Sequence, residues 1–236
     1  MLSNIKQDLT TFIPLCPEDK CTKCDLHKQA NHVGMSTVKY SFVEENDLVL
    51  LVLNQNPDFH EDLQGLSFTG KNNKILKESF LGGLQLKERC SIYLGYGVRC
   101  HSTNNEAPKP RHYFECTQYL INDLKSIQPN IILTLGAPTT ISFYKNILGI
   151  SKMSLKKSFS LNGNSYDNKD HNIKGVGGFN VFSTYHPNAV LRNNNLINSV
   201  HSHMELLSDC IDGTMATPSK PKIISTRSPN VYPRSS

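Results

Sequence analysis

Two pairs of cysteines have the spacing of a metal centre. Cys21 and Cys24 are separated by two residues, and Cys100 and Cys116 by fifteen. Four thiolates can complete the shell of a zinc ion or of an iron–sulfur cluster. A zinc ribbon usually has two close pairs, so the open second pair favours the larger cluster. The alternative is that Cys100 and Cys116 are buried core cysteines and that the first pair is coincidental. Three further cysteines have no partner at ligand spacing and are interpreted as structural: Cys16, Cys90 and Cys210.

Polar residues that could take part in catalysis follow two predicted strands. Asn56, within Asn-Gln-Asn-Pro at residues 54–57, carries an amide that can orient a water molecule. His186, within Tyr-His-Pro at residues 185–187, can donate a hydrogen bond where negative charge develops. Each residue also has a purely structural interpretation. Asn56 could cap a strand-ending turn, and the His186 ring could be satisfied within the fold.

These motifs are positioned by a predicted alternation of strands and helices. Apolar runs rich in β-branched residues predict four strands, at residues 48–53, 91–98, 130–135 and 180–184. Helical spacing predicts four helices, at residues 74–84, 113–127, 138–148 and 188–210. We therefore expect an α/β fold: a three-layer sandwich with a central, mainly parallel four-stranded sheet flanked by helices.

The motifs follow the strands directly, so we expect them to meet in the crevice at the carboxyl ends of the sheet. Residues 151–178 are predicted to form a long loop or irregular hairpin beside this crevice.

Length and composition limit the domain organisation and the compartment. A chain of 236 residues with 38% hydrophobic residues suffices for one large domain, which we place at residues 1–212. Residues 213–236 are interpreted as a disordered, basic, Pro/Ser-rich tail that carries most of the net charge of +5. No apolar run reaches the roughly 18 residues that span a bilayer, and the N-terminus lacks the order of a signal peptide. Seven cysteines, an odd number, favour a reducing compartment, so a cytoplasmic location is expected.

The order of the motifs resembles that of the family 4, iron–sulfur uracil-DNA glycosylases. Residues 21–28 (CTKCDLHK) are similar to the opening of that family, and residues 61–70 (EDLQGLSFTG) to its E-D-x-x-G-x-P-F-x-G run. Residues 116–120 (CTQYL) and 184–192 (TYHPNAVLR) match its later motifs, the last of them T-x-H-P-S-x-L-L-R. The resemblance implies an α/β glycosylase fold with a structural [4Fe–4S] cluster on Cys21, Cys24, Cys100 and Cys116. It also implies a monomer that binds DNA with a flipped-out nucleotide and has no membrane partner.

The resemblance also assigns roles around the reacting base. His186 would donate a hydrogen bond to the O2 atom of a leaving pyrimidine, and Phe68 would stack on the flipped base. The family pattern G-E-A-P-G differs here, since Gln55 replaces the glutamate and Asn56 the alanine. The Asn-Pro pair instead resembles the G-x-N-P-G motif of other branches, in which the asparagine positions the nucleophilic water. Gln55 is counted among the base-binding residues.

Contacts with DNA are expected from the segment after His186 and from scattered basic residues. Leu191 would fill the gap that the flipped nucleotide leaves in the duplex, next to Arg192 at the backbone. Further phosphate contacts are expected from basic residues near the crevice: Arg99, His101, Lys109, Arg111, Lys156 and Lys157.

Tyr96 is the clearest departure from the family pattern. Family 4 members carry an asparagine there, whose amide reads the uracil edge, whereas Tyr96 offers one hydroxyl. We therefore keep three hypotheses. The first is a DNA glycosylase that hydrolyses the N-glycosidic bond of uracil and leaves an abasic site. The second is the same chemistry on a modified or hypermodified pyrimidine, as in anti-phage defence. The third is a non-catalytic DNA-binding or replication-accessory protein that has kept the fold.

Overall fold

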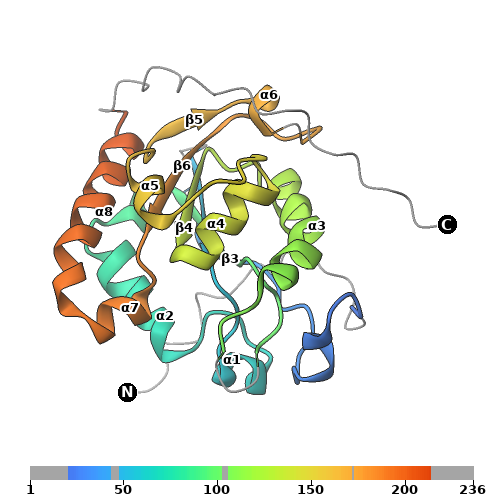
Figure 1. Ribbon diagram of the computed structural model, residues 1–236. Helices are drawn as coiled ribbons and strands as arrows, with labels where there is room; N and C mark the ends of the chain where they lie inside the picture. Colours follow the sequence, from blue (N-terminus) through green and yellow to red (C-terminus); the bar gives the residue numbers. More distant parts are fainter. Residues whose placement is uncertain (1–20, 44–47, 103–105, 172, 214–236) are drawn as a thin grey trace.

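The computed structural model describes residues 21–43, 48–102, 106–171 and 173–213 (Figure 1). The predicted tail at residues 213–236 lies outside this range except for Gly213, and Cys16 also lies outside it. Within the described part of the chain, no helix combines the length and the apolar composition needed to cross a membrane.

A six-stranded sheet forms the centre of the molecule, in the order β1-β3-β2-β4-β6-β5. Its four central strands are parallel and correspond to the four predicted runs: β2 (Val49–Asn54), β3 (Ser91–Tyr96), β4 (Ile131–Leu135) and β6 (Phe179–Thr184). Two short antiparallel strands form the edges, β1 (Val38–Ser41) and β5 (Asn164–Tyr166). The predicted α/β fold with a mainly parallel sheet is thus confirmed. The edge strands add two to the predicted four because neither contains a continuous apolar run.

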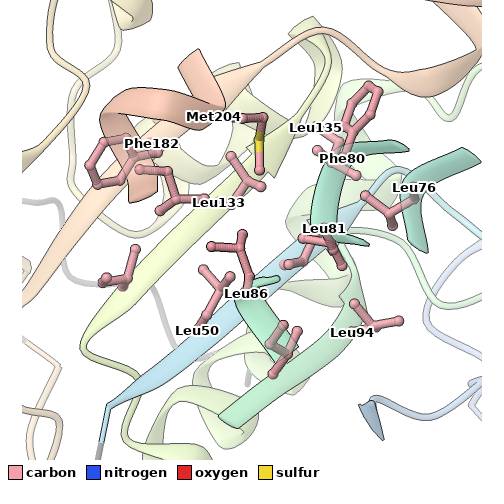
Figure 2. Close-up of a cluster of buried hydrophobic side chains, with 14 of the residues drawn as sticks. Leu50, Leu76, Phe80, Leu81, Leu86, Leu94, Leu133, Leu135, Phe182 and Met204 are labelled. Carbon is pink, nitrogen blue, oxygen red and sulfur yellow. The ribbon is translucent and has the colours of Figure 1, made fainter. Parts of the chain in front are cut away.

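Helices cover both faces of the sheet, which gives three layers (Figure 1). On one face, Leu50 and other side chains of the sheet pack on the π-helix η2 (Leu76–Gly82) and on α8 (Ile197–Ile211). Figure 2 shows Phe80 and Met204 from these two helices in that cluster. The opposite face packs on α3 (Pro110–Ile127) and α4 (Ala137–Asn146). Full burial of each such leucine stabilises the fold by about 1.5–3 kcal/mol.

Shorter helices connect the layers. Their bounds are η1 (Asp25–Lys28), α1 (Phe59–Gln64), α2 (Lys71–Ile75), η3 (Leu86–Glu88), α5 (Leu155–Phe159), α6 (Asn168–His171), α7 (Pro187–Arg192) and η5 (Asn194–Leu196). Segment 151–178 therefore contains two short helices and an edge strand as well as loop. The single helix predicted for residues 188–210 is interrupted, because Asn193 is extended (φ −146°) and its side chain accepts a hydrogen bond from the N–H of Asn195.

Candidate active site

The carboxyl ends of β2, β3 and β6 bring the predicted catalytic and base-binding residues to one edge of the sheet. Asn54, the last residue of β2, lies in register with Tyr96, the last residue of β3. His186 follows β6 and caps the N-terminus of α7. Side chains at the ends of three strands that are far apart in the sequence thus meet at the carboxyl edge of the sheet, where the strand order predicts a binding crevice.

His186 is held as a neutral hydrogen-bond donor. Its Nδ1 accepts the N–H of Asn188 at 3.1 Å, and its Nε2 lies 2.7 Å from Oδ1 of Asn54. Since an amide oxygen only accepts, the ring hydrogen must be on Nε2. Burial, together with the smaller effect of the positive charge of Arg192, lowers the pKa of His186 to about 4. The imidazole is therefore uncharged at neutral pH.

Gly136 at the end of β4 allows His186 to pack this closely. Its φ of +79° is in the left-handed region that favours glycine, and a Cβ atom there would lie 3.0 Å from Cβ of His186. A side chain at this position would displace the His186 backbone.

The rings of Phe68 and Tyr96 are stacked on each other. Their centroids are 4.3 Å apart with an angle of 15° between the planes, and each residue is 1% exposed. Phe68 has a left-handed backbone (φ 60°), which is strained for a residue with a side chain. Two hydrogen bonds hold it there: its N–H donates to the Tyr96 hydroxyl at 2.9 Å, and its carbonyl accepts from Nζ of Lys77 at 2.9 Å. One ring face of Phe68, the predicted platform for a base, is thus covered by Tyr96.

A buried carboxylate joins Tyr96 to the rest of the site. The Tyr96 hydroxyl donates to Oε1 of Glu61 at 3.0 Å, and the same oxygen accepts from Nδ2 of Asn73 at 2.6 Å. Asn73 in turn accepts a 3.4 Å hydrogen bond from Nδ2 of Asn54. Burial raises the pKa of Glu61 to about 7. Sequence reasoning did not identify Glu61, Asn73 or Asn54 as site residues, although Glu61 belongs to the recognised E-D run.

Gln55 and Asn56 lie in the loop that follows β2, and both are half-buried. The amide nitrogen of Asn56 donates to the carbonyl of Pro57 at 3.0 Å, so the amide oxygen can still accept a hydrogen from water. Two hydrogen bonds fix the backbone of Gln55: its N–H donates to Oδ1 of Asn54, and its carbonyl accepts from the N–H of Val98. The roles of Gln55 and Asn56 towards substrate stay predictions.

The four predicted cysteine ligands lie close to one another beside this site. Cys24, Cys100 and Cys116 are buried in one cluster, and Cys21 lies near enough to raise the thiol pKa of each of them by electrostatic repulsion. Backbone N–H groups donate to three of the sulfur atoms: that of Leu26 to Cys24, of Gly34 to Cys100 and of Arg99 to Cys116. Such N–H donors to sulfur are typical of iron–sulfur sites.

Burial is the main cause that raises the thiol pKa of Cys100 to about 12 and of Cys116 to about 11. Among the described residues, no set of three or more His, Cys, Asp or Glu side chains is arranged to hold a metal ion. Four thiol groups gathered in one place are a donor set that suits either a zinc ion or an iron–sulfur cluster.

Asp62 connects the cysteine segment to the active site. Its buried carboxylate accepts hydrogen bonds of 2.9 Å from the N–H groups of Asn31 and His32 and from the side chain of Asn31. These residues follow the first cysteine pair, and Asp62 is adjacent to Glu61 in α1. One short helix thus contacts both the cysteine segment, through Asp62, and Tyr96, through Glu61.

Comparison with known proteins identifies the family. Residues 41–205 match the model of the uracil DNA glycosylase superfamily. The chain belongs to this superfamily. It is therefore an enzyme of the DNA glycosylase class, the hydrolases that act on N-glycosyl bonds. The predicted family resemblance is confirmed.

Three curated relatives carry the name type-4 uracil-DNA glycosylase. The Thermotoga maritima protein is 30% identical over 176 residues, which cover 74% of this chain and 79% of the relative. The Archaeoglobus fulgidus protein is 31% identical over 72% of this chain and 78% of its own length. The Saccharolobus solfataricus protein is 30% identical over 74% of each chain.

The residues that the glycosylase would use on DNA are partly at the surface. On α7, Leu191 is 58% exposed and Arg192 is also exposed, as a wedge and a phosphate contact require. Lys109, Lys156 and Lys157 are exposed as well. Arg111 is exposed but forms an ion pair of 3.3 Å with Asp25.

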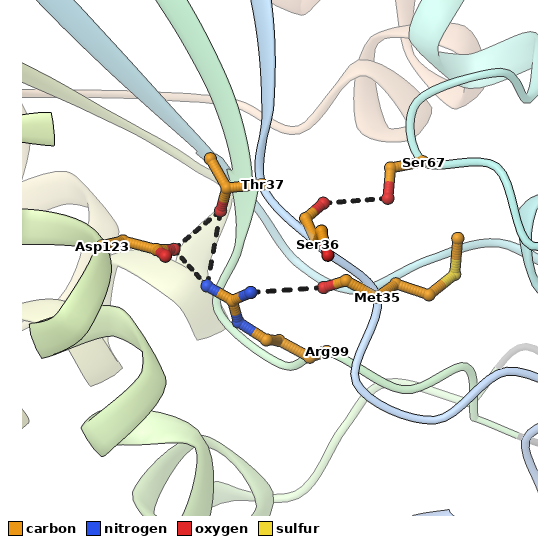
Figure 3. A network of polar contacts seen from close by, with 6 residues as sticks. All are labelled: Met35, Ser36, Thr37, Ser67, Arg99 and Asp123. Atoms are coloured by element: carbon orange, nitrogen blue, oxygen red, sulfur yellow. Dashed lines mark hydrogen bonds and ion pairs between the residues drawn. The ribbon is translucent and has the colours of Figure 1, made fainter. Parts of the chain in front are cut away.

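Two of the expected phosphate contacts are wrong. Arg99 is 1% exposed, and its guanidinium forms an ion pair with the buried carboxylate of Asp123 (Figure 3). It also donates to the carbonyl of Met35 and to the hydroxyl of Thr37, each at 3.4 Å. His101 is 7% exposed and contacts the carbonyl of Pro57 at 3.0 Å. Both side chains fix loops within the fold and are not available to DNA.

Proposed function

We propose that this chain excises uracil from DNA by hydrolysing the N-glycosidic bond of a flipped-out nucleotide, which leaves an abasic site. The observation that carries the proposal is the state of His186. A buried, neutral imidazole whose hydrogen is on Nε2 is the donor that an anionic leaving base requires.

In the proposed reaction, each step of the hydrolysis is assigned to a particular side chain. The bond between C1′ and the base nitrogen breaks with both electrons going to the base. The Nε2–H of His186 exchanges its hydrogen bond with Oδ1 of Asn54 for one with O2 of the base, where it stabilises the developing negative charge. The amide oxygen of Asn56 orients a water molecule, whose oxygen bonds to C1′. The proton that this water loses ends on the released base. Phe68 and Gln55 bind the base, and Tyr96 limits its shape.

The outer part of the site would hold DNA. Leu191 would enter the stack in place of the flipped nucleotide, and Arg192 would contact a phosphate. Both are exposed at the end of the helix that His186 caps. We expect the protein to act as a monomer in the cytoplasm.

We further propose that Cys21, Cys24, Cys100 and Cys116 hold a [4Fe–4S] cluster. The buried cysteine cluster and the N–H donors to three of its sulfur atoms support this assignment. The cluster would supply a structural tie between the N-terminal segment and the domain.

A modified pyrimidine is a second candidate substrate, and Tyr96 is the observation that favours it. The residue offers a hydroxyl and a ring at the position where family 4 members have a uracil-reading amide. A site that lacks a partner for one edge of a base discriminates poorly in favour of that base.

A substrate panel tests these proposals. Matched oligonucleotides containing uracil or 5-substituted pyrimidines are incubated with the wild type and with His186→Ala, and the released base is quantified. We expect uracil release by the wild type and a loss of about 10²–10³-fold in the variant. Release of a modified base without uracil would favour the second candidate. No release of any base, with DNA binding and biological activity unchanged in His186→Ala, would favour the non-catalytic accessory protein.

A further inference from the structure

A continuous line of buried amides connects His186 to Glu61. Nε2 of His186 lies 2.7 Å from Asn54, Asn54 lies 3.4 Å from Asn73, and Asn73 lies 2.6 Å from Glu61. The three residues beyond the histidine are 5%, 2% and 1% exposed, respectively. They come from β2, α2 and α1, so the line crosses the site from the histidine to the carboxylate beside Tyr96.

The direction of every hydrogen bond in this line follows from the carboxylate. Oε1 of Glu61 accepts from the Tyr96 hydroxyl and from the NH2 group of Asn73, so the side-chain oxygen of Asn73 faces Asn54. Asn54 must then present its NH2 group to Asn73 and its oxygen to His186. An oxygen at that position accepts only if Nε2 bears the hydrogen, which is the form that catalysis requires.

Glu61 is itself fixed by groups outside the line. The N–H of Asp58 donates to Oε2 of Glu61 at 2.7 Å, and the Asp58 side chain accepts the N–H of Glu61 at 2.9 Å. This capping box anchors the carboxylate at the first turn of α1. Tyr96 donates to the same oxygen as Asn73. One carboxylate oxygen of Glu61 therefore orients both Tyr96 and, through the two amides, His186.

We propose that Asn54 and Asn73 are positioning residues: they orient the His186 ring through hydrogen bonds that begin at the Glu61 carboxylate, and they keep the negative charge of Glu61 away from the ring. The inference rests on the proposed role of His186 as a neutral donor. A carboxylate in direct contact with the ring would favour the imidazolium, which would remove the neutral donor. Two uncharged amides in between orient the ring without that effect.

The charge at position 54 gives the sharpest test. Asn54→Asp keeps the shape of the side chain and places a carboxylate against Nε2. In the holoenzyme, the ring ¹⁵N signals of His186 are followed by NMR as the pH is varied. We expect the wild type to show the neutral Nε2–H form, and the protonation midpoint to rise by at least about one pH unit in Asn54→Asp. Arg192 is the charged residue whose field reaches His186, and it is the same in both proteins.

Asn198→Asp is the matched control, because Asn198 is exposed on α8 and its charge would be screened by water. An unchanged midpoint in Asn54→Asp, equal to that of the control, would overturn the proposal. So would an Nδ1–H form in the wild type.

Glu61→Gln provides a second variant if Asn54→Asp fails to fold. The new amide can offer a donor as well as an acceptor, so the direction of the line is no longer fixed, and we expect faster exchange of the His186 Nε2 hydrogen. Exchange equal to that of the wild type and of the exposed control Glu78→Gln would also overturn the proposal. Because no readout needs substrate, a wild type that releases no uracil would refute the proposed substrate and leave this test intact.

Discussion

The ring of Tyr96 lies on the ring of Phe68, and the hydroxyl of Tyr96 accepts the N–H of Phe68 at 2.9 Å. The residue that departs from the family pattern therefore occupies one face of the predicted base platform. Its second hydrogen bond, to Glu61, holds it there.

The first prediction is that Tyr96→Asn increases the rate of uracil release by at least roughly tenfold, because it uncovers Phe68 and restores an amide for the uracil edge. Single-turnover assays on a uracil oligonucleotide measure the rate. Tyr96→Phe is the control, since it keeps the ring over Phe68 and should give no increase. A slower Tyr96→Asn would mean that the tyrosine itself binds the base.

The second prediction concerns pH and Glu61. Its pKa is raised from 4.5 to about 7, so the folded chain binds this proton more tightly than the unfolded chain does. The stability it contributes is fully present below about pH 4.5 and is lost as the pH rises to about 7. Relative to Glu61→Gln, we expect the wild type to lose roughly 3 kcal/mol across this range. Denaturation of both proteins at several pH values measures the difference.

His186 acts in the opposite direction, because its pKa is lowered, but it is present in both proteins and cancels in that comparison. Glu78→Gln serves as the control, since Glu78 is exposed. A stability difference between wild type and Glu61→Gln that does not change with pH would contradict the prediction.

The third prediction concerns the Arg99–Asp123 pair. Arg99→Met leaves a buried carboxylate without its partner and should lower the free energy of unfolding by about 3–5 kcal/mol. Arg99→Met combined with Asp123→Leu should recover most of that loss. Arg111→Ala, which breaks an exposed pair, should cost less than about 1 kcal/mol. Thermal unfolding ranks the variants, and equal effects of the two single variants would refute the prediction.

The fourth prediction separates DNA insertion from folding. Leu191→Ala removes an exposed side chain, so the free energy of unfolding should change by no more than about 0.5 kcal/mol. Release of base from duplex DNA should fall by roughly tenfold, and release from single strands much less, because only a duplex has a gap to fill. Leu206→Ala on α8 is the control, with 39% exposure. An equal loss on both substrates would argue against a wedge.

The fifth prediction concerns the cysteines. Protein purified without oxygen should be brown, with broad visible absorption and about four iron atoms per chain. Cys116→Ser should lose the colour and melt at a lower temperature, whereas Cys210→Ala should keep the colour, because Cys210 lies outside the buried cysteine cluster. Colourless wild-type protein with stoichiometric zinc would exclude the iron–sulfur assignment.

The sequence predicted the parallel core because its strands are buried on both faces and therefore have continuous apolar runs, as residues 48–53 show. The edge strands β1 and β5 were not predicted, since an edge strand needs only one paired side and can remain polar. His186 and Phe68 were recognisable from their motifs. Charge alone misplaced Arg99, because only the fold brings Asp123 and Thr37 to its guanidinium.

The residues that orient His186 could not be predicted from the sequence either. Asn54, Asn73 and Glu61 are ordinary polar residues whose contact depends on where α1 and α2 lie against the end of β2. The hydrogen bonds are specific, yet nothing in their sequence spacing indicates them.

The adjacent carboxylates of α1 have a consequence for the cell. Both belong to a helix of six residues. Asp62 accepts hydrogen bonds from the segment that follows the first cysteine pair, and Glu61 accepts one from Tyr96. With the proposed iron–sulfur cluster on the four cysteines, iron shortage or oxidative stress would loosen the first contact and so disturb the second. On that proposal, we expect the DNA-repair capacity of the protein to follow the iron supply, although the cluster has a structural role.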